Sequence, residues 1–516
     1  MGLDTWYFVA VDYALGKSLV AFAIVISFGY SARAALTVSA SWRRSAGAPN
    51  AWRASPASSG CASPRSSPAR AEATVSGEPA PRGAKPARPK LGGTFLGGAK
   101  SRLLPASLVF RFFGAAVVFH ALAWAALLGG AAQWPLWRRG LGWPLAALHL
   151  VTLGTLLCSA IGASLQLLPV ATRQPVRSPR LAAWLWWLYV PGVATLALGM
   201  GLARPAWLAA GASAVLAALA LWAVLLGFNL RGARGMSGVV LHGWGALAAL
   251  ALLGVSAAAL VTLWLGRPWL DADAARGLHL VSGAFGVMGL LAFGLAYILL
   301  PMFALAGVPD ERQQLACGAA ALTALAAAAL AALAPVYGFA AQPLRLGALF
   351  AGALAYALHL RLMRRVLATG MRRDLGRGLR LMQLGWAGLG VALALGLALV
   401  LGAPADALGR LFGIALIGGW LLSFLLGVLQ RILPFLASMH AAQGQRRSPT
   451  PSSLTLERAL AWHFGAHLAA LALLAAAALT DQALLAAAAG AAGLMGALAF
   501  AAFFVVLMRR LAQATA

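Results

Sequence analysis

Twelve apolar stretches recur along the chain, and each is long enough to cross a lipid bilayer. They run from Leu108 to Met508. An α-helix needs about 20 predominantly apolar residues to span roughly 30 Å of hydrocarbon. Hydrophobic residues make up 61% of the chain and charged residues 10%, whereas soluble domains carry roughly 25% charged residues. The sequence therefore predicts an all-α fold, a polytopic transmembrane helical bundle.

The loops between these spans are of two kinds. We place the spans at 108–131, 142–169, 181–203, 205–229, 236–266, 276–306, 314–334, 344–364, 378–402, 409–438, 458–479 and 484–508, a twelve-helix transmembrane core within 106–516. Arginines follow the even-numbered spans, as at Arg364 and Arg365, whereas the opposite loops carry acids such as Asp271 and Asp406. Because cytoplasmic loops are enriched in Arg and Lys, both ends of the core are expected in the cytoplasm.

The same arginines account for much of the net charge of +28. In a soluble protein this charge would suggest nucleic acid as a partner. Here it lies in alternate loops, so membrane lipid is expected and nucleic acid is not. The excess of Ala, Leu, Gly and Arg is typical of a GC-rich bacterial genome. We therefore expect a multi-pass protein of the bacterial inner (cytoplasmic) membrane.

Residues 1–105 differ from the core. One candidate extra helix lies near 19–36 and is interrupted by Arg33, while 39–105 are rich in Ser, Pro, Ala, Gly and Arg. A segment of that composition, without a periodic apolar pattern, is expected to be disordered. Two interpretations are open: an N-terminal helix with a disordered linker, or residues added by a misassigned start codon.

Three similar phrases indicate an internal repeat. Leu-Leu-Pro169, Leu-Leu-Pro301 and Ile-Leu-Pro434 come late in spans 2, 6 and 10, and their prolines are 132 and 133 residues apart. Spans 2 and 6 also begin alike, with His149-Leu-Val-Thr and His279-Leu-Val-Ser. Self-similarity at a fixed spacing marks one structural unit used several times. The spacing equals four spans, so we predict three four-helix units.

Ionisable residues inside the spans are candidates for function, because hydrocarbon disfavours them unless they are paired. All twelve Asp and Glu lie in loops, in the N-terminal segment or at span ends, and the four Lys lie within the first hundred residues. Proton pumps and ion-coupled transporters usually hold a carboxylate at membrane depth, so neither is favoured. Histidines do occur in the spans: His120, His149, His242, His279, His359, His463 and His467, with His440 at the inner end of span 10.

His149 and His279 form the most informative pair. Both lie near the outer ends of spans that run in the same direction, so they are expected at one depth, whereas His242 lies toward the cytoplasm. Two neutral imidazoles at one depth on facing helices are what bis-His ligation of a haem iron requires. We predict His149 and His279 as the metal ligands and His242 as a further cofactor-binding candidate. The alternative is that these imidazoles only bond backbone carbonyls or hydroxyls.

The glycines in the spans have two interpretations, and the aromatic cluster has one main interpretation. Glycines that could admit a porphyrin beside the pair are Gly154, Gly162, Gly283, Gly286 and Gly289. Glycines in membrane helices also serve close helix packing. The aromatic cluster Trp184, Trp186, Trp187 and Tyr189 is assigned mainly to an interfacial aromatic belt.

Twelve helices in three four-helix units, with histidines on helices 2 and 6, resemble the haem-copper oxidase subunit I superfamily. That superfamily includes divergent nitric-oxide-response haem proteins called NnrS. The stretch from His149-Leu-Val-Thr-Leu-Gly154 to Leu167-Leu-Pro169 is similar to the second helix of such proteins, where a His ligates low-spin haem. The resemblance implies haem as cofactor, His149 as its first ligand, and a redox partner protein.

The chain also departs from the oxidase pattern. His279 is followed by Leu-Val-Ser in place of the copper-binding phrase, span 7 has no histidine, and Phe412 stands at the repeat-equivalent position of span 10. Methionines form no spaced ladder that could conduct copper. A haem-copper dinuclear centre and copper binding are therefore not expected.

The leading hypothesis is a haem-binding, non-pumping membrane protein that acts in nitric oxide or metal response or in redox chemistry. The rival is a multi-pass transporter or assembly factor without a prosthetic group, in which the histidines are structural. A terminal reductase subunit with unusual ligands is the third interpretation.

Overall fold

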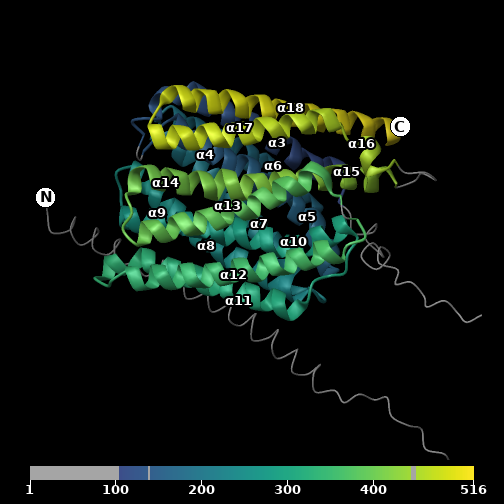
Figure 1. Ribbon diagram of the computed structural model, residues 1–516, viewed down its shortest axis with the longest axis horizontal. Coiled ribbons are helices and arrows are strands. Elements are labelled where there is room, and N and C mark those ends of the chain that lie inside the picture. Colours follow the sequence, from purple (N-terminus) through teal and green to yellow (C-terminus); the bar gives the residue numbers. More distant parts are fainter. Residues whose placement is uncertain (1–103, 138–139, 373, 443–448, 516) are drawn as a thin grey trace, which may run out of the picture.

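In the computed structural model, the described residues, 104–137, 140–372, 374–442 and 449–515, form helices and connecting turns without a strand. Within these ranges twelve helices are long and apolar enough to cross a membrane. They run side by side and alternate in direction (Figure 1). The prediction of an all-α transmembrane bundle is confirmed. The expected helix and linker of the N-terminal segment lie outside the described residues, apart from its last two positions.

The twelve spans divide into three consecutive groups of four. The first unit contains α3 (Ala106–Gly129), α4 (Trp143–His149) with η3 (Leu150–Leu157) and α5 (Cys158–Thr172), α6 (Pro179–Gly201) and α7 (Pro205–Arg231). The second contains α8 (Ser237–Trp264), α9 (Ala272–Leu280) with η4 (Val281–Gly289) and α10 (Leu290–Ala304), α11 (Glu311–Leu333) and α12 (Gln342–Thr369). The third contains α13 (Gly376–Val400), α14 (Ala405–Gly413) with η6 (Ile414–Leu422) and α15 (Ser423–Ala441), α17 (Glu457–Thr480) and α18 (Ala483–Thr515). Short helices η2 (Ala131–Gln133), η5 (Ala334–Tyr337) and α16 (Pro451–Leu454) lie in the connections.

The second span of every unit is built on the same plan. An α-helical stretch leads into a π-helical segment (η3, η4 or η6), and a second α-helical stretch follows with a proline inside it, at Pro169, Pro301 or Pro434. π-Helical turns are rare and concentrate at functional sites. Their recurrence at equivalent places supports the threefold repeat that the proline phrases predict.

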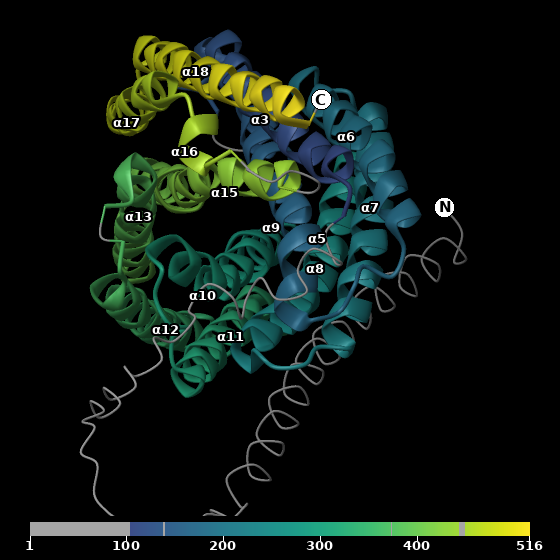
Figure 2. The same cartoon turned by 90° about the vertical axis from the view of Figure 1, so that its right-hand side faces the viewer.

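Packing within the units follows the same repeat. The first span of each unit lies against the π-helical segment of the second, so α3 contacts η3, α8 contacts η4 and α13 contacts η6. The third and fourth spans pair tightly with each other, as α6 with α7, α11 with α12 and α17 with α18. The last span, α18, packs against the first, α3, which joins the third unit to the first (Figure 2).

The bundle has two distinct ends. The short helices α4, α9 and α14 lie at one end, which we call the pair end because His149 and His279 lie there (Figure 1). The other end, where α5, α10 and α15 terminate, carries Arg173 and Arg372 in its turns, and we call it the arginine-rich end. Below, the depth of a side chain in the bundle is described relative to these two ends.

Candidate functional site

His149 and His279 lie next to each other at the pair end. Their ring centroids are 6.1 Å apart and the ring planes are inclined by 33°. His149 is the last residue of α4 and directly precedes η3, and His279 lies two residues before η4. The structure therefore brings together the two histidines that the sequence places at one depth. Their role as ligands stays a prediction.

The two imidazoles offer nitrogen atoms that the protein does not use. His149 bonds through Nδ1 to the carbonyl oxygen of Leu145 at 3.0 Å. That bond favours the tautomer with the proton on Nδ1, which leaves the Nε2 lone pair free, the usual arrangement of a metal-ligating histidine. The Nδ1 atom of His279 is buried without a partner. Both rings are only partly buried, so a ligand can reach them.

The separation of the rings fits a single ion held between them. Two metal–nitrogen bonds of about 2.0–2.1 Å, plus the distance from each nitrogen to its ring centre, put two imidazole centroids roughly 6 Å apart. The observed 6.1 Å matches this value. Within the described residues, no group of three or more His, Cys, Asp or Glu side chains could hold a metal ion. An ion at the pair would need its remaining ligands from a prosthetic group or from water.

The glycines named as a porphyrin slot are used for helix packing, which corrects the slot interpretation. A Cβ atom at Gly154 would lie 2.6 Å from Cβ of Phe119, and one at Gly286 would lie 2.4 Å from Cβ of Ala249. Gly162 and Gly289 likewise face Phe112 and Trp420 closely, and only Gly283 leaves ordinary room, 3.4 Å from Leu253. These glycines therefore provide no space for the ring of a haem.

His242 does not join the pair. It packs against Gly294, which comes 15 residues after His279 along the same span. At 1.5 Å per residue this places His242 roughly 20 Å from the pair along the helix axis. The prediction that His242 binds the same cofactor as His149 and His279 is therefore not supported by its position.

His242 belongs to a cluster that we call the second-unit cluster, with one side chain from each span of that unit: His242, Tyr297, Cys317 and His359. All four are buried, with 0–1% of their surface exposed. The hydroxyl of Tyr297 lies 3.4 Å from Nδ1 of His359, and the rings of Tyr297 and His242 lie 5.4 Å apart. His242 bonds through Nδ1 to the carbonyl of Gly238 at 2.7 Å. The cluster ties four helices together.

A second buried group, the third-unit cluster, consists of His120, Ser423, Gln430, His463 and His467. Nε2 of His467 lies 2.8 Å from Oγ of Ser423, and Nδ1 of His463 lies 3.2 Å from Nε2 of Gln430. The His120 and His463 rings are 6.3 Å apart. These residues come from α3, α15 and α17, so the cluster joins the third unit to the first.

The aromatic run of α6 is divided between the surface and the interior. Tyr189 is not part of an exposed aromatic belt, because it is fully buried and its hydroxyl donates to the carbonyl of Leu153 at 2.9 Å. Trp184 and Trp187 are 68% and 61% exposed, as a belt requires. Tyr189 could not be separated from them by sequence, because all lie within one short aromatic run.

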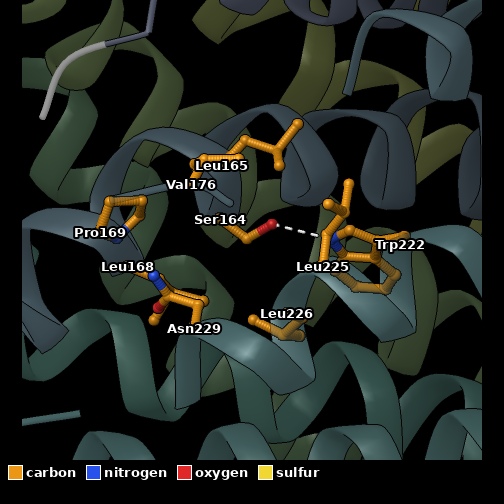
Figure 3. A pocket seen from close by; sticks show the side chains of 9 residues that line it. All are labelled: Ser164, Leu165, Leu168, Pro169, Val176, Trp222, Leu225, Leu226 and Asn229. Carbon is orange, nitrogen blue, oxygen red and sulfur yellow. Dashed lines mark hydrogen bonds between the residues drawn. The ribbon is translucent and has the colours of Figure 1, made fainter. Parts of the chain in front are cut away.

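A small pocket between α5 and α7 lies away from the pair, near the arginine-rich end (Figure 3). Its lining residues are Ser164, Leu165, Leu168, Pro169, Val176, Trp222, Leu225, Leu226 and Asn229. Nε1 of Trp222 donates to Oγ of Ser164 at 3.0 Å, and Nδ2 of Asn229 donates to the carbonyl of Gln174 at 3.0 Å. Its polar groups thus have partners within the protein, which leaves the imidazole pair as the better candidate site.

Comparison of the sequence with protein-family models and with curated proteins gives no match.

Proposed function

We propose that the protein is a haem-binding, non-pumping membrane protein in which His149 and His279 are the axial ligands of one iron. The single observation that carries this proposal is the exposure of a pair with this spacing: the rings are 6.1 Å apart and both are partly exposed, whereas His120 and His463, 6.3 Å apart, are buried. No group of three or more His, Cys, Asp or Glu side chains among the described residues could hold the ion, so the protein would supply only these two imidazoles. A porphyrin would provide the remaining equatorial ligands, which is the division of roles in bis-His haem proteins.

The residues around the pair support a redox role. An iron held by His149 and His279 would supply one-electron chemistry. His149 is oriented by its bond to the carbonyl of Leu145, and such a bond from the other ring nitrogen raises the basicity of an imidazole that binds a metal. Within the described ranges every Asp and Glu side chain is exposed. The interior therefore offers no carboxylate relay for proton pumping.

A visible spectrum of the detergent-purified protein, as isolated and after dithionite, tests the proposal. Sharp reduced bands of a low-spin haem are expected, either directly or after reconstitution with hemin. A featureless spectrum from a folded, monodisperse sample that has been offered hemin would contradict it.

The second candidate is a transporter or assembly factor without a prosthetic group. The observation that favours it is the filling of the glycine positions beside the pair, with Ala249 and Phe119 in the places where a porphyrin edge was expected. In that case His149 and His279 face each other only as packing neighbours. The same spectrum decides between the two candidates, since only the first binds hemin through these histidines.

We further propose that the protein lies in the bacterial inner membrane with the arginine-rich end in the cytoplasm, in contact with lipid and with a redox partner protein. The support is the distribution of arginines. Single cysteines in loops 170–180, 365–377 and 441–456 should resist an impermeant maleimide added to intact cells, and those in 267–275 and 403–408 should react. The native Cys61 is first replaced by Ser, whereas Cys158 and Cys317 are buried and should stay silent. Strong labelling within 365–377 would overturn this topology.

A further inference from the structure

We propose that His149 and His279 hold a divalent transition-metal ion without a porphyrin, with water as the remaining ligands. This inference rests on the second candidate function and deepens it, since it names a metal cation as the substrate class of that transporter or assembly factor. Its basis is a disagreement within the site. The spacing of the two imidazoles suits a metal ion, whereas the glycines beside them leave no space for a haem ring. A hydrated ion needs no such space.

Each of the two rings offers a nitrogen atom to such an ion. Nδ1 of His149 donates to the carbonyl of Leu145 at 3.0 Å, which leaves the lone pair on Nε2. Nδ1 of His279 is buried and has no hydrogen-bond partner. A buried polar atom without a partner is destabilising. A bond to the ion, or to one of its water ligands, would satisfy this nitrogen.

The spacing of the rings selects the arrangement of the two nitrogens. With metal–nitrogen bonds of about 2.0–2.1 Å, the centroids are as far apart as the observed 6.1 Å only when the two bonds point in roughly opposite directions. Zinc prefers a tetrahedral arrangement, whereas tetragonal sites with nitrogen and oxygen ligands suit nickel(II) or copper(II). Calcium and magnesium take oxygen ligands. The geometry therefore favours a tetragonal transition-metal ion.

Exposure distinguishes this site from a second pair of histidines with nearly the same spacing. The rings of His120 and His463 are 6.3 Å apart, but at most 2% of either residue is exposed. Both rings of the proposed site are partly exposed. The charged residues of α9 do not oppose a cation there, because Arg276 is ion-paired with Asp273 at 2.8 Å. An ion from the medium at the pair end therefore reaches the proposed site and not the buried pair.

Aromatic rings lie below the site and keep a bound ion at the pair end. Phe285 comes six residues after His279 on the same span, which places it roughly 9 Å deeper. Its ring lies 5.7 Å from that of Trp420, and the ring of Phe293 lies 6.2 Å from the same indole. These rings separate the pair from the second-unit cluster and offer no lone pair to a metal. Among the described residues, no group of three or more His, Cys, Asp or Glu could receive the ion. The pair therefore holds the ion and does not pass it through the bundle.

The test measures nickel(II) binding to the full-length protein, purified in detergent without a histidine tag and stripped of metal. Nickel(II) is the probe because it accepts opposed nitrogen ligands and keeps its oxidation state. Equilibrium dialysis should find one ion per chain. His149→Ala and His279→Ala should each weaken binding about tenfold or more, because even the groups that orient a ligand affect metal affinity to that extent. His463→Ala, from the buried pair, is the control and should bind as wild type does. No binding by wild type, or equal binding by His149→Ala, overturns the inference.

A second measurement needs no substitution and decides the matter if the variants do not fold. Saturating nickel(II) should slow the modification of His149 and His279 by diethyl pyrocarbonate several-fold, as read by mass spectrometry. Unchanged rates at both histidines overturn the inference. Zinc(II) should bind more weakly than nickel(II), and tighter binding of zinc(II) contradicts the opposed arrangement of the nitrogens.

Hemin offered to the same preparation separates this inference from the haem proposal. Nickel(II) binding that depends on both histidines, without low-spin bands after hemin, supports the inference and contradicts the haem. Low-spin bands that depend on both histidines, without nickel(II) binding, do the reverse. Binding of neither overturns the inference and leaves the second candidate function without a metal.

Discussion

The pair end and the third-unit cluster use the same side chain in two different ways. At the pair end, His149 and His279 are partly exposed and lie beside π-helical segments, and Nδ1 of His279 has no partner. In the third-unit cluster, His463 and His467 are at most 2% exposed and bond to Gln430 and Ser423 of the neighbouring span. Nε2 of His463 also lacks a partner, so the two regions differ in exposure: the pair is open, as the proposed ligand site requires, whereas the buried cluster connects helices.

The largest expected effect comes from His149→Ala, which removes one axial nitrogen. The low-spin bands should be lost or replaced by high-spin bands, and His279→Ala should do the same, because one missing ligand suffices to change the spin state. The double variant should resemble either single one. Absorption spectra of matched preparations measure this. A wild-type spectrum in His149→Ala would mean that any haem is held elsewhere.

His463→Ala is expected to lower the stability of the protein and to leave its spectrum unchanged. Truncation of this buried ring leaves a cavity and an unpartnered Gln430 amide, which should lower the free energy of unfolding by about 2–4 kcal/mol. The spectrum should stay as in wild type, since the cluster does not touch the pair. Thermal unfolding in detergent, followed beside His149→Ala, provides the comparison. Equal losses of stability in the two variants would remove the distinction between the regions.

The sequence predicted the spans and the His149–His279 contact because both depend on periodic features, the length of apolar runs and the repeat spacing. Predicted and observed spans differ at their ends by at most seven residues, as for 484–508 against Ala483–Thr515. Sequence could not decide between a slot and packing for the glycines, and it did not reveal the buried hydroxyl bond of Tyr189. Both features depend on the rotation of the helices about their axes. This rotation decides which neighbour packs against a glycine and which carbonyl a buried hydroxyl reaches. A hydropathy pattern with apolar residues on every face does not define that rotation.

A smaller effect is expected from Gly286→Ala, which tests whether the glycines beside the pair serve packing. Its Cβ would lie 2.4 Å from that of Ala249, so α8 and η4 must move apart, at about 1–3 kcal/mol. Gly283→Ala, in the same segment, meets only Leu253 at 3.4 Å and serves as the matched control. Thermal unfolding should show a loss for Gly286→Ala and almost none for Gly283→Ala. Equal behaviour of the two would argue that the notch at Gly286 is not rigid.

The smallest expected effect comes from deletion of residues 1–100. Their Ser-, Pro- and Arg-rich composition supplies little apolar surface that a core could bury, and the first span begins only at Ala106. Both the pair and the third-unit cluster are assembled from residues after that point. The truncated protein should therefore insert, unfold at the wild-type temperature and keep the wild-type spectrum. Loss of membrane-inserted protein at unchanged synthesis would show that the segment contributes to the core, and a change in the spectrum alone would assign its contribution to the pair end.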